Sequence, residues 1–288
     1  MKEEIDAFLS YLSTDKKFSE NTIVAYKNDL FQFEDFIQNQ DKIQHWSEVD
    51  RQLVLSYLSD LKKRGYALST VARKTASVKS LFKFLADKAL VHNVPTENLG
   101  SPRVKKRIPD LLSRDQVKEL LKQPDKYGTP GAMRDKAMLE LLYASGFRAS
   151  ELTSLNVEDL NVDDTSISCL VKGSKVRTIT IPRDSVPSLH KYIEEARPHL
   201  ASEKGEKALF LNRLGERLTR QGFWQIMKNY AKEAKLDTLV TPRVMRHSFA
   251  AHTLSKGADL HSLQQSLGHA NVSTTQAYVQ LASQRKSI

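Results

Sequence analysis

Two arginines, a lysine and a tyrosine in the second half of the chain have the side chains that phosphodiester transfer needs. Arg148 and Arg246 carry guanidinium groups. Each guanidinium can bind two oxygens of one phosphate and stabilise the negative charge that develops on those oxygens. Tyr278 offers a hydroxyl nucleophile that can form a covalent intermediate, and Lys172 offers an ammonium that can protonate a departing oxygen. Each residue alone is more simply explained as a surface or packing residue, so the prediction depends on the set.

This chemistry is expected to need neither a metal ion nor a nucleotide. The sequence has no carboxylate cluster suited to Mg²⁺ and no glycine-rich phosphate loop of the kind that binds ATP. Its eight histidines are scattered, and His247 and His252 have the wrong spacing for a shared zinc site. We therefore predict no metal site and no cofactor.

The elements that must position these residues are mainly helical in residues 1–100. Apolar side chains recur there at steps of three and four residues, which is typical of an amphipathic helix. They are Ile23, Tyr26, Leu30, Phe33 and Ile37. Further helices are predicted over about 47–64 and from about residue 69, so this part should form a small helical bundle.

The second half combines helices with one hairpin. Apolar residues alternate with polar ones over 167–171 and again over 179–181, and the basic turn sequence KGSK lies between them. Helices are predicted from about 113 and over about 131–146, 185–197, 219–234, 242–256 and 259–268, and from 273 onward. The predicted fold is therefore mainly α, with an N-terminal bundle and a mixed α/β second domain that contains a small antiparallel sheet.

Length and composition indicate two domains joined by a charged linker. For 288 residues about two domains are expected, and prolines bracket four basic residues in SPRVKKRIP. We therefore assign residues 1–100 to the first domain, 101–112 to a basic linker and 113–288 to the second domain. The single cysteine, the lack of a signal peptide and the lack of a long apolar run predict a cytoplasmic protein without a membrane segment.

The net charge of +10 favours a polyanionic partner, either nucleic acid or an anionic membrane surface. A charge that serves only solubility is the alternative. Residues 1–50 contain 5 basic and 11 acidic side chains, whereas residues 51–100 contain 9 basic and 3 acidic ones. One edge of the first domain is therefore expected to be basic, and the net excess lies in the linker and the second domain.

The order and spacing of these motifs resemble the tyrosine recombinase (phage integrase) family, most closely its Xer-like branch. The string YASGFRASEL at 143–152 is similar to the family's first arginine box, and RHSFA at 246–250 is similar to the second. LGH at 267–269, followed by STT at 273–275 and by Tyr278, is similar to the nucleophile segment. The helical first half resembles the core-binding, SAM-like domain, so the resemblance covers almost the whole chain.

The resemblance implies a site-specific recombinase that cleaves and rejoins duplex DNA through a 3′-phosphotyrosyl bond, without metal or ATP. Tyr278 would attack the phosphate, and Lys172 would protonate the 5′-oxygen, with Lys175 as a nearby competitor. His269 would hydrogen-bond the phosphate, and Glu151 would support the basic cluster. The implied catalytic residues are Arg148, Lys172, Arg243, Arg246, His269 and Tyr278.

Position 243 departs from the family pattern, which usually has a histidine three residues before the second arginine. Arg243 cannot accept a proton at neutral pH, although it can donate hydrogen bonds to phosphate. Two interpretations stay open: a natural variant in which His269 or water takes the role of the base, or a position that was altered. In either case His247 is expected to pack or to bond locally and not to replace the histidine.

The implied partner is duplex DNA at a specific inverted-repeat site, bound by a homo-tetramer or hetero-tetramer on synapsed DNA and associated with the nucleoid. Family members dock a C-terminal segment into a neighbouring protomer. Only ten residues follow Tyr278, so we expect this exchange between protomers to be reduced or the chain to be truncated. The predicted role is Xer-like chromosome or plasmid resolution. A mobile-element integrase or transposase, a type IB topoisomerase and a catalytically weak DNA-binding relative are the alternatives. The candidate DNA-binding residues are Lys62, Lys63, Arg73, Lys74, Lys79, Lys105, Lys106, Lys175, Arg213, Arg217 and Arg220.

Overall fold

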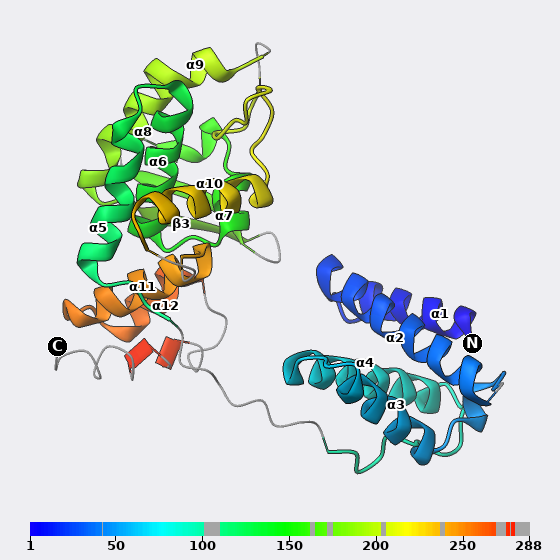
Figure 1. Cartoon of the computed structure of the whole chain (residues 1–288). Helices are drawn as coiled ribbons and strands as arrows, with labels where there is room; N and C mark the ends of the chain where they lie inside the picture. Colours follow the sequence, from blue (N-terminus) through cyan, green and yellow to red (C-terminus); the bar gives the residue numbers. More distant parts are fainter. Residues whose placement is uncertain are drawn as a thin grey trace. The chain divides into compact units, whose positions relative to one another are not determined.

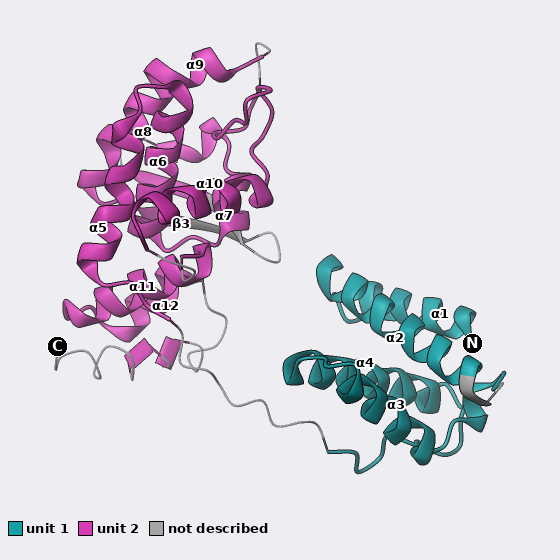
Figure 2. Cartoon of the chain, in the orientation of Figure 1, with its two compact units in different colours: residues 1–107 teal, residues 108–288 magenta. Residues whose placement is uncertain are grey.

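A computed structural model describes most of the chain as two compact units, Met1–Arg107 and Ile108–Ile288 (Figure 2). The division falls within segment 101–112, for which the sequence predicts a linker. The described residues are 1–41, 43–100, 110–161, 165–171, 175–202, 206–236, 240–268, 275–276 and 278–279, and the side chains of 40–41, 169–171 and 175–177 lie outside the description.

The described part of unit 1 is helical, as predicted (Figure 1). Its elements are α1 (Lys2–Thr14), α2 (Glu20–Asp41), a 3₁₀ turn (Trp46–Glu48), α3 (Arg51–Lys63) and α4 (Leu68–Asp87). The sequence predicted a single helix from about residue 47, and the structure corrects this start. The carboxylate of Asp50 accepts a hydrogen bond of 2.8 Å from the amide of Leu53, so the helix begins after Asp50 and the preceding turn is separate.

The core of unit 1 confirms the apolar stripe on α2. Leu30, Phe33 and Ile37 are fully buried, and Ile23 and Tyr26 pack against the same cluster while partly exposed. The stripe faces the other helices because residues three and four apart lie on one side of a helix. Unit 1 is therefore held together by its own apolar core.

The second unit contains the predicted hairpin and an additional short strand. The order is β1 (Leu160–Asn161), β2 (Ser166–Val171) and β3 (Lys175–Thr180), with both pairs antiparallel. Ile167 is paired with Ile179, and both are buried. The basic tip at 172–174 lies outside the described residues. The two-residue strand β1 was not predicted because it is too short to show any alternation.

Most helices of unit 2 follow the predicted segments, but the short helix α7 (Ala149–Ser154) was not predicted. The helices are α5 (Arg114–Lys122), α6 (Pro130–Ser145), α7, α8 (Val186–Lys191), α9 (Arg197–Leu200), α10 (Arg220–Glu233), α11 (Pro242–Ser255) and α12 (Leu260–Leu267). The segment predicted as one helix over 185–197 is instead α8 and α9 joined by a π-helical turn, Tyr192–Ala196. Short 3₁₀ turns at 123–126, 157–159 and 183–185 complete the described elements.

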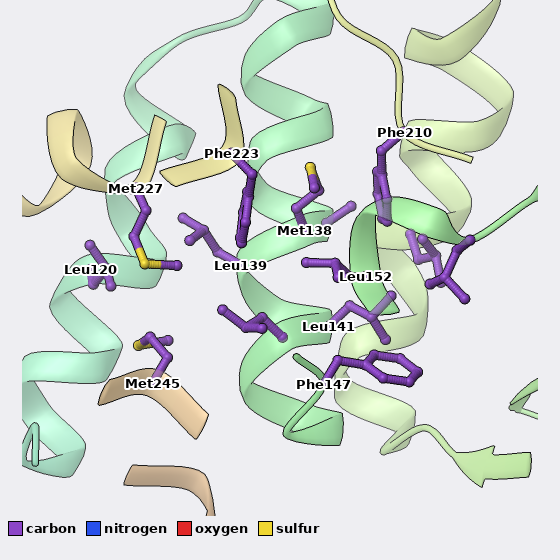
Figure 3. Packing of buried hydrophobic residues seen from close by; sticks show 14 of the residues in the cluster. Leu120, Met138, Leu139, Leu141, Phe147, Leu152, Phe210, Phe223, Met227 and Met245 are labelled. Carbon is purple, nitrogen blue, oxygen red and sulfur yellow. The ribbon is translucent and has the colours of Figure 1, made fainter. Parts of the chain in front are cut away.

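Helix α6 forms the centre of the unit 2 core. Figure 3 shows Met138 and Leu139 of α6 among side chains from the surrounding elements, including Phe223 and Met227 of α10 and Met245 of α11. All five side chains are fully buried. Helices α7, α10 and α11 are thereby fixed against one scaffold. Because side chains on rigid helices hold their geometry, this packing is suited to positioning a reactive site.

Candidate active site

The end of α6 positions Arg148. Gly146 closes the helix with a φ of +64°, a left-handed conformation that favours glycine. A Cβ atom at this position would lie 2.4 Å from the ring of Phe249 on α11, so glycine also allows the two helices to approach. Two residues later Arg148 occupies the N-cap of α7, and its side chain is 42% exposed. The turn therefore presents this guanidinium at the surface of a packed core.

The carboxylate of Glu151 connects the two arginines. It accepts hydrogen bonds from the backbone amide of Arg148 at 2.7 Å and from the guanidinium of Arg148 at 2.5 Å. The guanidinium of Arg246 lies 3.7 Å from the same carboxylate, and Glu151 and Arg246 are both buried. The predicted supporting role of Glu151 is consistent with this geometry, because one negative charge offsets part of the repulsion between two cations.

Arg246 links the ends of two helices. It lies on α11, where Thr241 caps the helix by accepting a hydrogen bond from Val244. Its guanidinium donates to the carbonyl of Gly146 at 2.5 Å and to the carbonyl of Leu267 at 2.6 Å, and the residue is 6% exposed. These carbonyls belong to the C-terminal ends of α6 and α12, where positive charge is favourable.

The hydroxyl of Tyr278 lies beside this basic cluster. Tyr278 is 3% exposed and packs with Ala250 of α11 and with Leu263 and Leu267 of α12. Burial raises the pKa of the Tyr278 hydroxyl, although the nearby arginines act in the opposite direction. The hydroxyl is therefore protonated at neutral pH and must lose its proton when it reacts.

His247 contacts Tyr278 directly, and sequence reasoning left it out of the site. Its Nδ1 lies 2.6 Å from the Tyr278 hydroxyl, and its Nε2 accepts a hydrogen bond of 3.1 Å from Nε of Arg243. Burial, followed by the charges of Arg243 and Arg246, lowers the pKa of His247 to about 4. The only sequence signal for this arrangement is the four-residue spacing that places Arg243 and His247 on one face of α11.

A cavity of about 700 Å³ opens over these residues. The N-terminal ends of α10 and α11 border it together with the Arg148 turn, and backbone amides at helix N-termini attract anions. Arg220, predicted as a general DNA contact, lies in this cavity. The cavity residues that sequence reasoning missed are Ala149, Ser150, Gln221, Trp224, Thr241, Pro242 and His247. With Arg148, Arg220, Arg243 and Arg246 on its walls, the cavity is suited to an anionic group.

Two predicted catalytic residues cannot be compared with this arrangement. Lys172 and His269 lie outside the described residues, as do the predicted DNA contacts Lys105 and Lys106. Lys175 begins β3, but its side chain is also outside the description. Their roles stay predictions that derive from the family resemblance.

The predicted DNA contacts in unit 1 occupy different environments. Lys62 and Lys63 are exposed at the end of α3. Lys74 is buried and its ammonium donates to the carboxylate of Asp29 at 2.8 Å, so it is not positioned to contact a phosphate directly. Arg73 forms an ion pair with the same carboxylate but remains partly exposed. The prediction for Lys74 is corrected because its charge is needed inside the bundle.

Three further candidates differ in the same way. Lys79 is half-buried and donates to the carbonyl of Leu99 at 2.8 Å, which ties the end of unit 1 to α4. Arg217 donates to the carbonyls of Thr153 and Leu155 and thus stabilises the segment after α7. Arg213 is exposed. Lys79 and Arg217 therefore have structural partners, which weakens their assignment as DNA contacts.

The described residues contain no group of three or more histidine, cysteine or acidic side chains arranged to hold a metal ion. Within the same part of the chain, none of the helices combines the length and the apolar character needed to cross a bilayer.

Comparisons with known proteins identify relatives of both units. The model of the phage integrase family matches residues 110–285, and that of the phage integrase N-terminal SAM-like domain matches residues 5–89. Tyrosine recombinase XerC of Roseiflexus castenholzii is 46% identical over 283 residues, which cover 98% of this chain and 90% of that protein. Tyrosine recombinase XerD of Oceanobacillus iheyensis is 40% identical over 282 residues, which cover 98% and 94%.

A solved structure shares the fold. The XerH site-specific recombinase, bound to a palindromic difH substrate in a post-cleavage complex, aligns with a TM-score of 0.77 at 20% identity and covers 98% of this chain and 92% of that one. At 20% identity, this structural likeness supports the shared fold alone. The family relationship comes from the family models and from the sequence matches to XerC and XerD.

Proposed function

The chain belongs to the phage integrase family, in its Xer tyrosine recombinase branch, and we propose that it cuts and rejoins duplex DNA through a covalent bond to Tyr278. The observation that supports this proposal best is the position of the Tyr278 hydroxyl beside the arginine cavity, with Arg148 and Arg246 on its walls. Guanidinium groups around a hydroxyl are suited to phosphoryl transfer, because they stabilise the charge on the phosphate oxygens while the hydroxyl attacks.

In the proposed reaction the Tyr278 oxygen attacks phosphorus and the bond between phosphorus and the 5′-oxygen breaks. The phenol loses one proton and the leaving 5′-oxygen gains one, so the products are a 3′-phosphotyrosyl bond and a free 5′-hydroxyl. Rejoining reverses these steps with the 5′-hydroxyl of another strand. One phosphodiester is exchanged for another ester at each step, so the reaction needs no ATP.

The remaining residues have supporting roles in this proposal. Glu151 keeps the two guanidinium groups in place through the contacts described above. Lys172 protonates the leaving oxygen and His269 hydrogen-bonds the phosphate, both by resemblance to the family. The guanidinium groups supply the positive charge that a metal ion supplies in other phosphoryl-transfer enzymes.

We further propose that the DNA site is an inverted repeat and that four protomers act on two synapsed sites. Each unit contributes its own basic surface, with Lys62 and Lys63 in unit 1 and Arg213 and Arg220 in unit 2. By resemblance to the Xer-like branch, to which the relatives named XerC and XerD belong, we assign this recombination to chromosome or plasmid resolution at the nucleoid, with mobile-element integration as the alternative. Arg243, which cannot act as a base, is the one feature that favours a catalytically weak DNA-binding relative.

A covalent trap tests the proposal. A duplex pool with a randomised centre is first enriched on the full chain, and the selected inverted repeat is then made with a nick beside each candidate cleavage position. A nick lets the short 5′-hydroxyl fragment diffuse away, so the phosphotyrosyl product accumulates. After denaturation, the wild type is expected to run as a protein–DNA adduct.

The matched variants are Tyr278→Phe and Tyr143→Phe. Tyr143 is the suitable control because its hydroxyl also bonds a histidine of α11, Nδ1 of His252 at 2.9 Å, yet it does not line the cavity. Tyr278→Phe should abolish the adduct and Tyr143→Phe should retain it. Tight binding by the wild type without any adduct contradicts the proposal and indicates the binding-only alternative. Relaxation of supercoiled plasmid of any sequence by a monomer indicates a topoisomerase instead.

A further inference from the structure

We propose that His247 donates a hydrogen bond to the Tyr278 hydroxyl, in a tautomer that Arg243 fixes, and that this pair orients the nucleophile in place of the usual family histidine at position 243. The proposal rests on the proposed role of Tyr278 as the nucleophile. It gives Arg243 a role that the sequence analysis left open, and it gives His247 a role beyond the local packing or bonding that the sequence analysis expected.

The tautomer follows from the hydrogen-bonding capacity of the two side chains. Nε of Arg243 is only a donor, and it lies 3.1 Å from Nε2 of His247, so Nε2 must offer its lone pair. A neutral imidazole carries a single N–H, which must then be on Nδ1. Because Nδ1 lies 2.6 Å from the Tyr278 hydroxyl oxygen, the histidine donates and the tyrosine oxygen accepts.

The charge around the ring keeps His247 neutral. The cationic groups that act on the ring are Arg243 and Arg246, both on α11, and together with burial they lower the pKa of His247 to about 4. Arg148, at the start of α7, adds a third positive charge near the Tyr278 ring. A second proton on the imidazole is therefore unfavourable at neutral pH, and only one ring nitrogen can donate.

This arrangement defines what His247 does during cleavage. A donor at Nδ1 stabilises the negative charge that forms on the tyrosine oxygen as the phenolic proton is lost. The phenol loses its proton to solvent, and the 5′-oxygen acquires one as its bond to phosphorus breaks. His247 retains its own proton throughout, so it is a donor and an orienting group and not a general base.

The role of Arg243 follows from the same contacts. Arg243 is exposed on the first turn of α11, where its Nε reaches the histidine one turn further along the helix. Among the described residues, Arg243 is the hydrogen-bond donor to Nε2, so it is the group that selects the Nδ1–H form. Arginine at a position usually occupied by histidine is thereby accommodated, because it acts through the neighbouring imidazole and need not accept a proton itself.

Nitrogen NMR tests the tautomer without DNA. The full chain is labelled with ¹⁵N-histidine, and long-range ¹H–¹⁵N correlations report which ring nitrogen carries the proton. The His247 signals are those that disappear in His247→Asn. We expect the proton on Nδ1 in the wild type and a shift towards the Nε2–H form in Arg243→Leu. A proton on Nε2 in the wild type overturns the proposal whatever the enzyme does with DNA.

Single-turnover adduct formation on the nicked duplex tests the function of the donor. The amide nitrogen of asparagine can occupy the place of Nδ1, whereas that of glutamine reaches the place of Nε2. We expect His247→Ala and His247→Gln to be about ten- to a hundredfold slower and His247→Asn to stay within about threefold of the wild type. His252→Ala is the control. His252 lies on α11, as His247 does, and this variant removes the corresponding histidine–tyrosine hydrogen bond, to Tyr143 of α6, so the rate should be unchanged.

The outcomes separate the two proposals. If His247→Asn is as slow as His247→Ala, or if His247→Ala is as fast as the wild type, the donor role is wrong even though Tyr278 forms the adduct. If the wild type forms no adduct, the proposed function fails, while the NMR measurement still decides the tautomer. Thermal unfolding of each variant identifies any loss of rate that is due to loss of the fold.

Discussion

Replacing Arg246 by lysine should weaken the fold as well as the reaction, whereas the same change at Arg148 should weaken the reaction alone. Both arginines line the cavity, but they differ in burial and in their contacts with helix ends. Arg246 is buried and joins the ends of α6 and α12, while the side chain of Arg148 is 42% exposed. The two substitutions therefore separate the structural role from the chemical one.

The magnitude follows from the contacts of Arg246. Its guanidinium donates to the Gly146 carbonyl at 2.5 Å and to the Leu267 carbonyl at 2.6 Å, and one ammonium cannot span both. A hydrogen bond to a charged group contributes about 1.5–3 kcal/mol, so Arg246→Lys should cost about 2 kcal/mol. For a unit of this size that lowers the melting temperature by about 4–8 °C. Arg148→Lys, at a solvent-screened site, should cost less than about 1 kcal/mol.

The assay uses the distribution of the two tryptophans. Trp46 lies in unit 1 and Trp224 in unit 2, so a Trp46→Phe background makes tryptophan fluorescence a reporter of unit 2. Thermal unfolding is then compared for the background, for Arg246→Lys and for Arg148→Lys, alongside adduct formation on the nicked duplex. Equal melting temperatures for the two lysine variants would refute the reasoning that Arg246 ties two helices together.

Three further predictions concern packing, pH and salt. Gly146→Ala should destabilise unit 2 by about 3 kcal/mol in urea titration, because the new methyl group meets the Phe249 ring at a left-handed φ; an unchanged midpoint would contradict the packing. Protonation of His247 is disfavoured in the fold, where its pKa is about 4 against an ordinary 6.5. Stability should therefore be full above pH 6.5 and fall as the pH drops towards 4, and His247→Asn should flatten that fall. If Lys62 and Lys63 each bind a phosphate, changing both to glutamine should reduce the salt slope of DNA affinity by about 2, and an unchanged slope would exclude them as contacts.

The helices were predictable because their signals are local. The apolar stripe on α2 lies within the helix that it specifies, whereas the start of α3 was placed too early because the cap at Asp50 was overlooked. The errors arose where such a signal was weak or was overridden. The two-residue β1 has no periodicity, and the π-helical turn after α8 keeps a helix-like pattern while changing its hydrogen bonds.

The burial of Lys74 shows a different limit. On its helix it has the same local character as Arg73, and both were predicted to face DNA. In the structure the two side chains share Asp29 of α2, about 45 residues earlier in the chain, and only Lys74 is enclosed by the bundle. Whether a cation faces solvent or a buried carboxylate depends on helix packing, which the sequence around it does not record.

The sequence by itself determined the types and order of the reacting groups: two arginine boxes, a terminal tyrosine and an arginine where the family usually has histidine. Only the tertiary structure decided which of them meet. Arg243 and His247 are neighbours by helical spacing, but Tyr278 lies 31 residues further on and reaches His247 through the packing of α11 and α12. Arg246 and Gly146, 100 residues apart, meet for a similar reason. Contacts over such separations depend on how whole helices pack into one core. That packing cannot be predicted from the local pattern of residues.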